Sequence, residues 1–246
     1  MSKIIRVNYT GTIKGTGEIF DTTYEEVAKK NNMHSMHRTY KPMVMILGEN
    51  RIIQGLEHEL EKMKQGDEKT IELSKADAYG ERKQDLIQLV PLQTFRKNNV
   101  NPVPGMVLNL DNGLRAKVQS VSGGRVRLDM NHELAGKDLV FEVRIEEIPE
   151  TDEQKARAVF DLTFPGIDKS DLKISIGGAK KPAKQQVMTP EQAVKAEDKT
   201  NKGTFITIRM PKSALGLNDY QARKLVLSQD LKKYLEADSV KIEEEY

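Results

Sequence analysis

The feature that most constrains the fold of this chain is the stretch of residues 43–80, where three hydrophobic patterns follow one another. It opens with the apolar run MVMIL, which predicts a strand that Gly48 ends. Apolar residues then recur at steps of three and four from residue 52 to residue 63, which predicts a helix with one apolar face. A second strand over residues 69–73 follows. Because both ends of the stretch carry large apolar or aromatic side chains, we expect it to form most of an apolar pocket.

Alternating polar and apolar residues predict further strands that can join this stretch in one sheet. The alternation over residues 3–13 is typical of a half-buried strand. A glycine-rich turn leads to a short strand over residues 18–21, and a polar loop follows over residues 22–41. The alternation over residues 139–145 predicts one more strand, well placed to complete the sheet.

A different pattern lies between residues 82 and 137. Three predicted strands, over residues 106–110, 114–121 and 125–130, are separated by the turn sequences DNG and SGG. Asn-Gly between apolar runs is a strong hairpin signal because a type I′ turn needs positive φ. About 50 residues of this kind form only a marginal domain, which we expect the rest of the chain to steady.

After Pro149 the chain changes to a mixture of patterns that predicts an α+β region of unknown role. In this region the period-two alternation predicts strands, and the TPEQ sequence predicts a short helix with Thr189 as its N-cap. The predicted elements are strands over residues 158–164 and 172–176, a short helix at 189–192, a strand over 204–210, a helix over 218–235 and a last strand around 240–242.

The composition narrows the classes of function. The 246 residues include no cysteine, which excludes disulfides and thiolate chemistry, and the net charge of +2 gives no strong attraction to nucleic acid or membranes. No signal peptide or membrane span is evident, so we expect a cytoplasmic protein. His34 and His37 lie close together without a third ligand nearby, so we expect no metal site and no cofactor.

Seven short motifs now appear in a fixed order. They are VNYTG at residues 7–11, IFD at 19–21, KPMVMILG at 41–48, IIQGLE at 52–57, MKQGD at 63–67, AYG at 78–80 and FEV at 141–143. This order and spacing closely resemble the FKBP family of peptidyl-prolyl cis/trans isomerases. The resemblance covers roughly residues 3–83 and 137–149, and it is specific as a set although no single motif would be.

The resemblance implies an α+β fold in which a twisted antiparallel half-barrel wraps around a short helix, and a proline ring sits in an apolar cup on that helix. It implies that Asp21, the backbone N–H of Ile53 and the hydroxyl of Tyr79 are the catalytic groups. The substrate-binding walls of the cup would come from Tyr9, Phe20, Met43, Met45, Ile52, Leu56 and Phe141. Each of these residues taken alone is more often an ordinary core or turn residue.

This chain departs from the family pattern inside the cup. Leu56 stands where the family often has a tryptophan, and Met43 and Met45 stand where it has aromatic residues. Methionine adapts its shape to what it contacts, so we expect a wider and softer cup than is usual.

The insertion after Gly80 resembles the SlyD-like branch of the family, in which a chaperone domain interrupts the flap. The sequence NHELAGKDL at residues 131–139 resembles that branch's return segment, and the long C-terminal region resembles long archaeal members. The resemblance divides the chain into an isomerase domain (residues 1–83 and 134–151), an inserted flap domain (84–133) and a C-terminal α+β domain (152–246).

The function implied is isomerisation of prolyl bonds in unfolded or nascent proteins, with a chaperone activity from the insert. The partners would be proline-containing peptides and unfolded chains. The alternative is a non-catalytic chaperone that uses the pocket and the insert for binding alone. In the insert, one set of apolar residues could form either a surface for unfolded chains or the only core of that domain: Leu89, Val90, Phe95, Met106 and Leu108.

Two further partners stay open for the C-terminal region. Lys180, Lys181 and Lys184 form a modest basic cluster, which is either a solvated loop or a contact with the ribosome or nucleic acid. The region as a whole could also form a homodimer.

Overall fold

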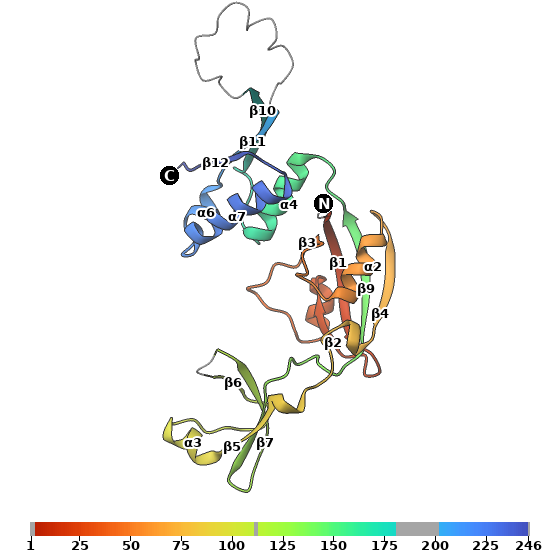
Figure 1. Cartoon of the computed structure of the whole chain (residues 1–246), viewed down its shortest axis with the longest axis vertical. Coiled ribbons are helices and arrows are strands. Elements are labelled where there is room, and N and C mark those ends of the chain that lie inside the picture. The colour runs from red at the N-terminus through yellow and green to blue at the C-terminus, as the bar shows by residue number, and fades with distance from the viewer. Residues whose placement is uncertain (1–2, 111–112, 181–201, 246) are drawn as a thin grey trace, which may run out of the picture.

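The computed structural model describes residues 3–110, 113–180 and 202–245, whose strands form three separate sheets. Each sheet has a hydrophobic cluster of its own. The described residues form an elongated molecule: the insert lies at one end, the C-terminal segment (residues 152–180 and 202–245) lies at the other, and the first sheet lies between them (Figure 1). None of the helices in the described residues is long and apolar enough to cross a bilayer.

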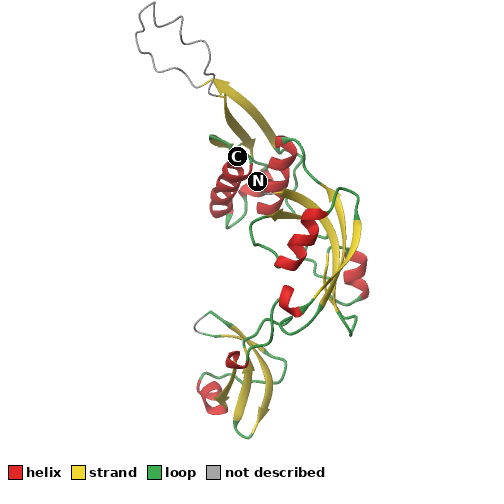
Figure 2. Cartoon of the chain, turned by 45° about the vertical axis from the view of Figure 1, so that its right-hand side comes forward, coloured by secondary structure: helices red, strands yellow, loops and turns green. Residues whose placement is uncertain are grey.

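The first sheet is antiparallel, and its strand order is β2-β1-β9-β4, with β3 also paired to β1. Residues 3–7 of the long strand β1 pair with β3, and residues 10–12 pair with β2 on the same side. The curved strands are visible in Figure 2. This sheet confirms the predicted strands; its members are β1 (Lys3–Ile13), β2 (Ile19–Thr22), β3 (Met43–Leu47), β4 (Glu68–Leu73) and β9 (Leu139–Glu147).

One face of this sheet packs on helix α2 (Gln54–Lys62), as the spacing of its apolar residues predicts. Leu56 and Leu60 of the helix are buried in one cluster with sheet residues such as Val7, Phe141 and Ile145. A short helix, α1 (Glu25–Lys30), lies in the polar loop between β2 and β3. The 3₁₀ turns η1 (Lys75–Asp77) and η2 (Gln84–Leu86) lead from β4 into the insert.

The sheet of the insert has the order β5-β8-β7-β6, so it has one strand more than the sequence predicts. The additional strand lies at the edge and buries little apolar surface, which is why its sequence, IQLVP, shows no alternation. The core consists of Ala116, Val118, Val126 and Leu128. The elements are β5 (Ile87–Pro91), α3 (Leu92–Lys97), β6 (Val107–Asn109), β7 (Arg115–Ser122) and β8 (Arg125–Asp129).

The prediction of a strand over residues 158–164 is wrong, because residues 158–163 belong to helix α4 (Asp152–Thr163) and Phe164 caps its end. Ala156, Val159, Phe160 and Thr163 are buried, and they follow the helical steps of three and four. The helix begins with a capping box. The Thr151 hydroxyl accepts a hydrogen bond from the Gln154 N–H, and the Gln154 side-chain oxygen accepts one from the Thr151 N–H. The capping sequence TDEQ at residues 151–154 therefore indicates a helix, and it outweighs the polar–apolar alternation that predicts a strand.

Three strands and the long helix of the C-terminal segment confirm the predictions over residues 172–176, 204–210, 218–235 and 240–242. The short helix Lys212–Leu215 was not predicted. Strand β11 pairs antiparallel with β10 and parallel with β12, so the sheet is mixed. The short helix expected at residues 189–192 lies outside the described residues. The elements are β10 (Lys173–Lys180), β11 (Lys202–Arg209), α6 (Lys212–Leu215), α7 (Tyr220–Tyr234) and β12 (Ser239–Glu243).

Candidate functional site

The residues expected to line the cup come together on the α2 side of the first sheet. The side chains of Tyr9, Met45, Leu56 and Phe141 are buried in one cluster. Phe20, Ile52 and Ile53 are partly buried and pack against the same cluster. Met43 and Tyr79 remain 45% and 39% exposed, and neither belongs to that cluster.

Aromatic rings form one wall of the cup. The rings of Phe20 and Phe141 meet edge to face with centroids 5.6 Å apart, and the Tyr9 ring lies 6.2 Å from that of Phe141. Gly11 makes this packing feasible, because a Cβ atom there would lie 2.5 Å from Cζ of Phe20. Sequence reasoning treated Gly11 only as part of a motif and missed its role as the space that Phe20 fills.

The rim of the cup carries a polar network centred on Asp21. The Tyr9 hydroxyl donates to Oδ2 of Asp21 at 2.5 Å, and Nη1 of Arg38 donates to Oδ1 at 2.6 Å. Burial raises the pKa of Tyr9, and the hydrogen bond to Asp21 and its charge raise it further, so the hydroxyl stays protonated. Arg38 was missed because a single arginine in a polar loop carries no sequence signal.

The entry to α2 presents a backbone donor to the cup. Ile53 precedes the helix, and its carbonyl accepts hydrogen bonds from the N–H groups of Leu56 and Glu57. Its own N–H has no acceptor among the described residues, so it can donate to a carbonyl of a ligand. The buried Glu57 side chain accepts the Gly48 N–H at 2.7 Å, which fixes the turn after β3 to the helix.

Tyr79 is held by a residue from the far side of the insertion. Its ring stacks on the imidazole of His132, with centroids 3.9 Å apart and planes within 5°. Nδ1 of His132 accepts the N–H of Leu134 at 3.2 Å, which orients the imidazole. Burial raises the pKa of Tyr79, and the negative charge of Asp21 adds to this effect, so the hydroxyl remains a donor at neutral pH.

The two crossings between the first sheet and the insert are tied to each other. The side-chain amide of Asn131 donates to the Lys83 carbonyl at 3.0 Å and accepts the Lys83 N–H at 2.9 Å. Asp129, which is 2% exposed, pairs with Arg82 and also accepts hydrogen bonds from Gln119 and from Asn131. These bonds hold the insert beside Tyr79.

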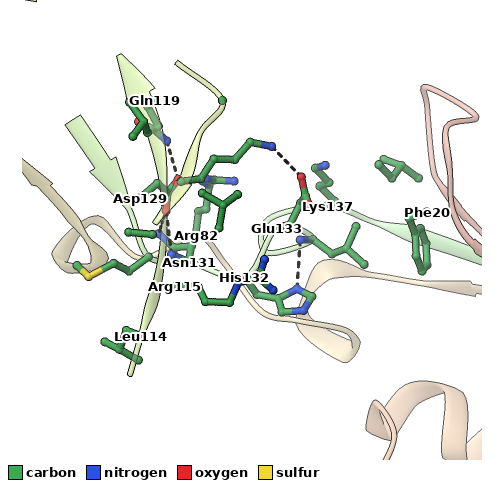
Figure 3. A pocket seen from close by; sticks show the side chains of 18 of the residues that line it. Phe20, Arg82, Leu114, Arg115, Gln119, Asp129, Asn131, His132, Glu133 and Lys137 are labelled. Atoms are coloured by element: carbon green, nitrogen blue, oxygen red, sulfur yellow. Dashed lines mark hydrogen bonds and ion pairs between the residues drawn. The ribbon is translucent and has the colours of Figure 1, made fainter. Parts of the chain in front are cut away.

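A cleft with a volume of about 1230 Å³ opens between the insert and the β1–β2 hairpin (Figure 3). Phe20 of the cup lines one side, and Arg115 and Gln119 line the insert side. Lys117 of β7 and Glu133, which both line the cleft, form an ion pair at 2.8 Å.

The apolar residues singled out in the insert were expected to form either its core or a surface for unfolded chains, and the structure divides them between buried and exposed positions. Val90, Phe95, Met106 and Leu108 pack as partly buried residues against the core of the insert, which favours the core role for them. Leu89 is 62% exposed and lies on the surface.

No group of three His, Asp or Glu side chains that could hold a metal occurs among the described residues. His34 stacks on Tyr40 and contacts Glu25, and His37 is exposed. Of the basic cluster, Lys181 and Lys184 lie outside the described residues.

Together these features bring buried apolar and aromatic side chains, hydrogen-bond donors and one carboxylate to the same side of the first sheet. Residues 88–134 match the sequence profile of the FKBP26 IF domain. A short-type peptidyl-prolyl cis-trans isomerase of Methanocaldococcus jannaschii is 36% identical over 144 residues, which cover 58% of this chain and 90% of that relative. The FKBP-type peptidyl-prolyl cis-trans isomerase SlyD of Vibrio cholerae is 38% identical over 107 residues, which cover 42% of this chain and 53% of SlyD.

The chain belongs to the family of FKBP-type peptidyl-prolyl cis-trans isomerases, and it is an enzyme of that class with SlyD proteins among its relatives. Among solved structures, the N-terminal domain of FKBP42 from Arabidopsis thaliana is 17% identical, with a TM-score of 0.31 over 60% of this chain and 73% of that chain.

Proposed function

We propose that this isomerase acts on prolyl bonds in unfolded or nascent proteins and that the insert holds these chains as a chaperone. The observation that carries the proposal is the attachment of the insert at the mouth of the cup. The segment that returns from the insert supplies His132, which stacks on Tyr79, and the cleft beside it ends at Phe20. In this proposal the isomerase site and the surface that holds unfolded chains therefore lie next to each other.

The cup acts by stabilising a twisted amide. Rotation about an X–Pro bond has a barrier of about 18–20 kcal/mol because the C–N bond has partial double-bond character. At the 90° twist the resonance is lost and the amide is less charge-separated. A dry apolar cup therefore favours the twisted amide over the planar one, which is differential binding of the transition state. Such a mechanism needs neither a nucleophile nor proton transfer.

The polar groups at the rim orient the substrate. The Ile53 N–H and the Tyr79 hydroxyl are the donors that hold substrate carbonyls. Asp21 is held by Tyr9 and Arg38, so its charge is fixed at the edge of the cup. The proline ring contacts the aromatic wall and the methionines at the mouth, whose flexible side chains adapt to different neighbours.

The insert offers loose affinity for unfolded chains. Large apolar side chains remain exposed on it: Leu89 (62%), Val103 (52%), Leu114 (48%) and Val107 (47%). A chain held there presents its prolines to the cup at a raised effective concentration. In this proposal the isomerase domain comprises residues 1–83 and 134–151, the flap domain 84–133 and the C-terminal domain 152–246, and the protein works in the cytoplasm.

The test is to remove the insert without disturbing its crossings. Ile87 and Asp129 are antiparallel partners, so replacing residues 88–128 by Asn-Gly closes a hairpin and keeps Asn131 and His132. We expect activity on a proline tetrapeptide to stay within about twofold, because the cup is intact. We expect catalysis of refolding of a proline-limited unfolded protein to fall by roughly a hundredfold, because the effective concentration is lost.

Both activities are measured in a protease-free assay with the complete chain as the reference. Equal losses on the two substrates would show that the insert supports the cup and does not hold clients. If the complete chain did not accelerate isomerisation of the tetrapeptide, the non-catalytic chaperone alternative would replace the proposal.

A further inference from the structure

The strand that supplies both methionines of the cup is buried on its two faces by different parts of the chain. Met45 and Leu47 of β3 belong to the cluster around α2. Val44 and Ile46 belong instead to the cluster of the C-terminal segment, with Phe160 of α4. A strand buried on both faces is fixed in position by both neighbours, so the C-terminal segment forms the back support of the cup.

The loop that follows β3 is held by the C-terminal helix α7. Glu49 forms an ion pair with Lys233. Nη2 of Arg51 lies 3.7 Å from Oδ1 of Asp230, whose side chain is 11% exposed, and the Arg51 guanidinium lies 5.9 Å from the centre of the Tyr234 ring. These contacts join segments that are about 180 residues apart in the sequence, as the ion pair between positions 49 and 233 shows.

The same loop is held on its other side by α2. Gly48 donates its N–H to the Glu57 carboxylate at 2.7 Å. Asn50, which lies between Gly48 and Arg51, has a φ of 51°, a left-handed conformation that asparagine tolerates. The loop therefore runs between two helices and is fixed to both. Ile52 and Ile53, which contact the cup, follow immediately.

We propose that Arg51 is a positioning residue of the isomerase site and that the C-terminal segment, through Asp230 and Tyr234, sets the position of the Ile53 N–H. The inference rests on the role proposed above for that N–H. Arg51 and Ile53 are two residues apart, so their Cα atoms are separated by at most about 7.6 Å. A displacement of the arginine therefore moves the donor, and a shift of about 1 Å at a binding group weakens its interactions strongly.

The test uses Arg51→Ala, Asp230→Asn and the double variant in the complete chain. For Arg51→Ala we expect the dissociation constant of a proline tetrapeptide to rise about threefold to tenfold, and kcat/KM to fall by the same factor, with kcat changed by less than about twofold. This split follows because the donor holds the carbonyl in the ground state and the transition state alike. The amide resonance of Ile53 should shift in the free protein.

The double variant separates positioning from general weakening. Because Asp230 acts on the loop through Arg51, Asp230→Asn should add little to the effect of Arg51→Ala on peptide affinity. The matched control is Arg209→Ala, which removes ion pairs with Glu243 and Glu245 at the C-terminal sheet. This control should leave peptide affinity at the wild-type value, and thermal unfolding of all variants is recorded alongside.

Two results would overturn the inference while leaving the isomerase assignment intact. One is an active wild type whose affinity for the tetrapeptide is unchanged by Arg51→Ala. The other is a loss of affinity in Arg209→Ala equal to that in Arg51→Ala, which would indicate a general loss of stability. If the wild type itself failed to isomerise the tetrapeptide, the proposed function would fail first.

Discussion

At the scale of single residues, the site depends on pairs that are distant in sequence. Tyr79 closes the stretch that leads into the insert, and His132 lies on the segment that returns from it, yet their rings stack in parallel. An aromatic stack of this kind contributes about 0.5–1.5 kcal/mol beyond the area it buries. It therefore restricts the orientation of the tyrosine hydroxyl that we assign to substrate binding.

This stack predicts the effect of changing His132. We expect His132→Ala to lower kcat/KM for a proline tetrapeptide by about threefold to tenfold, since the stacking free energy that orders Tyr79 is lost. His132→Phe keeps a ring in place and should retain most of the activity. The control is His58→Ala on the exposed face of α2. An unchanged rate in His132→Ala would show that Tyr79 is positioned without the imidazole.

At the scale of elements, helix α4 is fixed to strand β1 by a buried carboxylate. The side chain of Asp161 is 2% exposed and accepts hydrogen bonds from Arg6 at 2.6 Å and Lys169 at 2.7 Å. Burial disfavours the charged form, but the bonds from Lys169 and Arg6 outweigh it and hold the pKa of Asp161 below its ordinary value. The carboxylate thus joins α4, the loop after it and the first sheet.

The lowered pKa predicts how stability depends on pH. The unfolded chain binds a proton at Asp161 near pH 4, whereas the folded chain does so only at lower pH. The stabilisation is therefore complete above about pH 4 and is lost as pH falls through the folded-state pKa. Asp161→Asn should cost about 3 kcal/mol at pH 7, because Lys169 loses its carboxylate partner and Arg6 keeps only its ion pair with Glu147.

Urea unfolding of the wild type and of Asp161→Asn at pH 7 and at pH 3 measures this difference. We expect the difference in the free energy of unfolding between the wild type and Asp161→Asn to be smaller at pH 3 than at pH 7. The control is Glu153→Gln on the exposed side of the same helix, where the pair with Arg157 contributes little. A difference in the free energy of unfolding that is the same at pH 7 and pH 3 would show that the charge of Asp161 does not provide the stabilisation.

At the scale of the whole molecule, the C-terminal segment covers the back of the first sheet. Ile4, Val44 and Ile46 are buried in its cluster, so removing residues 152–246 would expose them to water. Truncation is therefore a poor way to ask whether this segment forms a homodimer, because exposed apolar residues would cause association of their own. Single substitutions on its outer surface answer the question better.

We propose that a homodimer, if the chain forms one, uses the outer face of α7, where Leu225 and Val226 are 65% and 47% exposed. The wild-type mass in solution should then be that of two chains, and Leu225→Glu should reduce it to one, since a buried unpaired charge is costly. The control is Leu89→Glu on the insert, which should not change the mass. A monomeric wild type at micromolar concentration would rule out this interface.

The sequence by itself determined the order of most elements, and its resemblance to the family supplied the residues expected in the cup. Local periodicity predicted β1, α2, β9 and α7, because each buries mainly one face against a neighbour. A continuous apolar run predicted β3, which is buried on both faces. It failed for α4, where alternation and helical spacing coincide over the same residues and the capping box decides between them. It also failed for β5, an edge strand whose few buried side chains leave no pattern.

Only the tertiary structure decided which distant residues meet. Arg38 at Asp21, His132 on Tyr79, Gly11 beneath Phe20 and Arg51 at Asp230 join segments whose own sequences carry no sign of the contact. A local pattern records whether a side chain is buried, because burial follows the period of the helix or strand. It does not record the partner, because the partner is chosen by how sheets and helices pack. The burial of the apolar residues around α2 was therefore predictable, and the distant contacts that hold these segments in place were not.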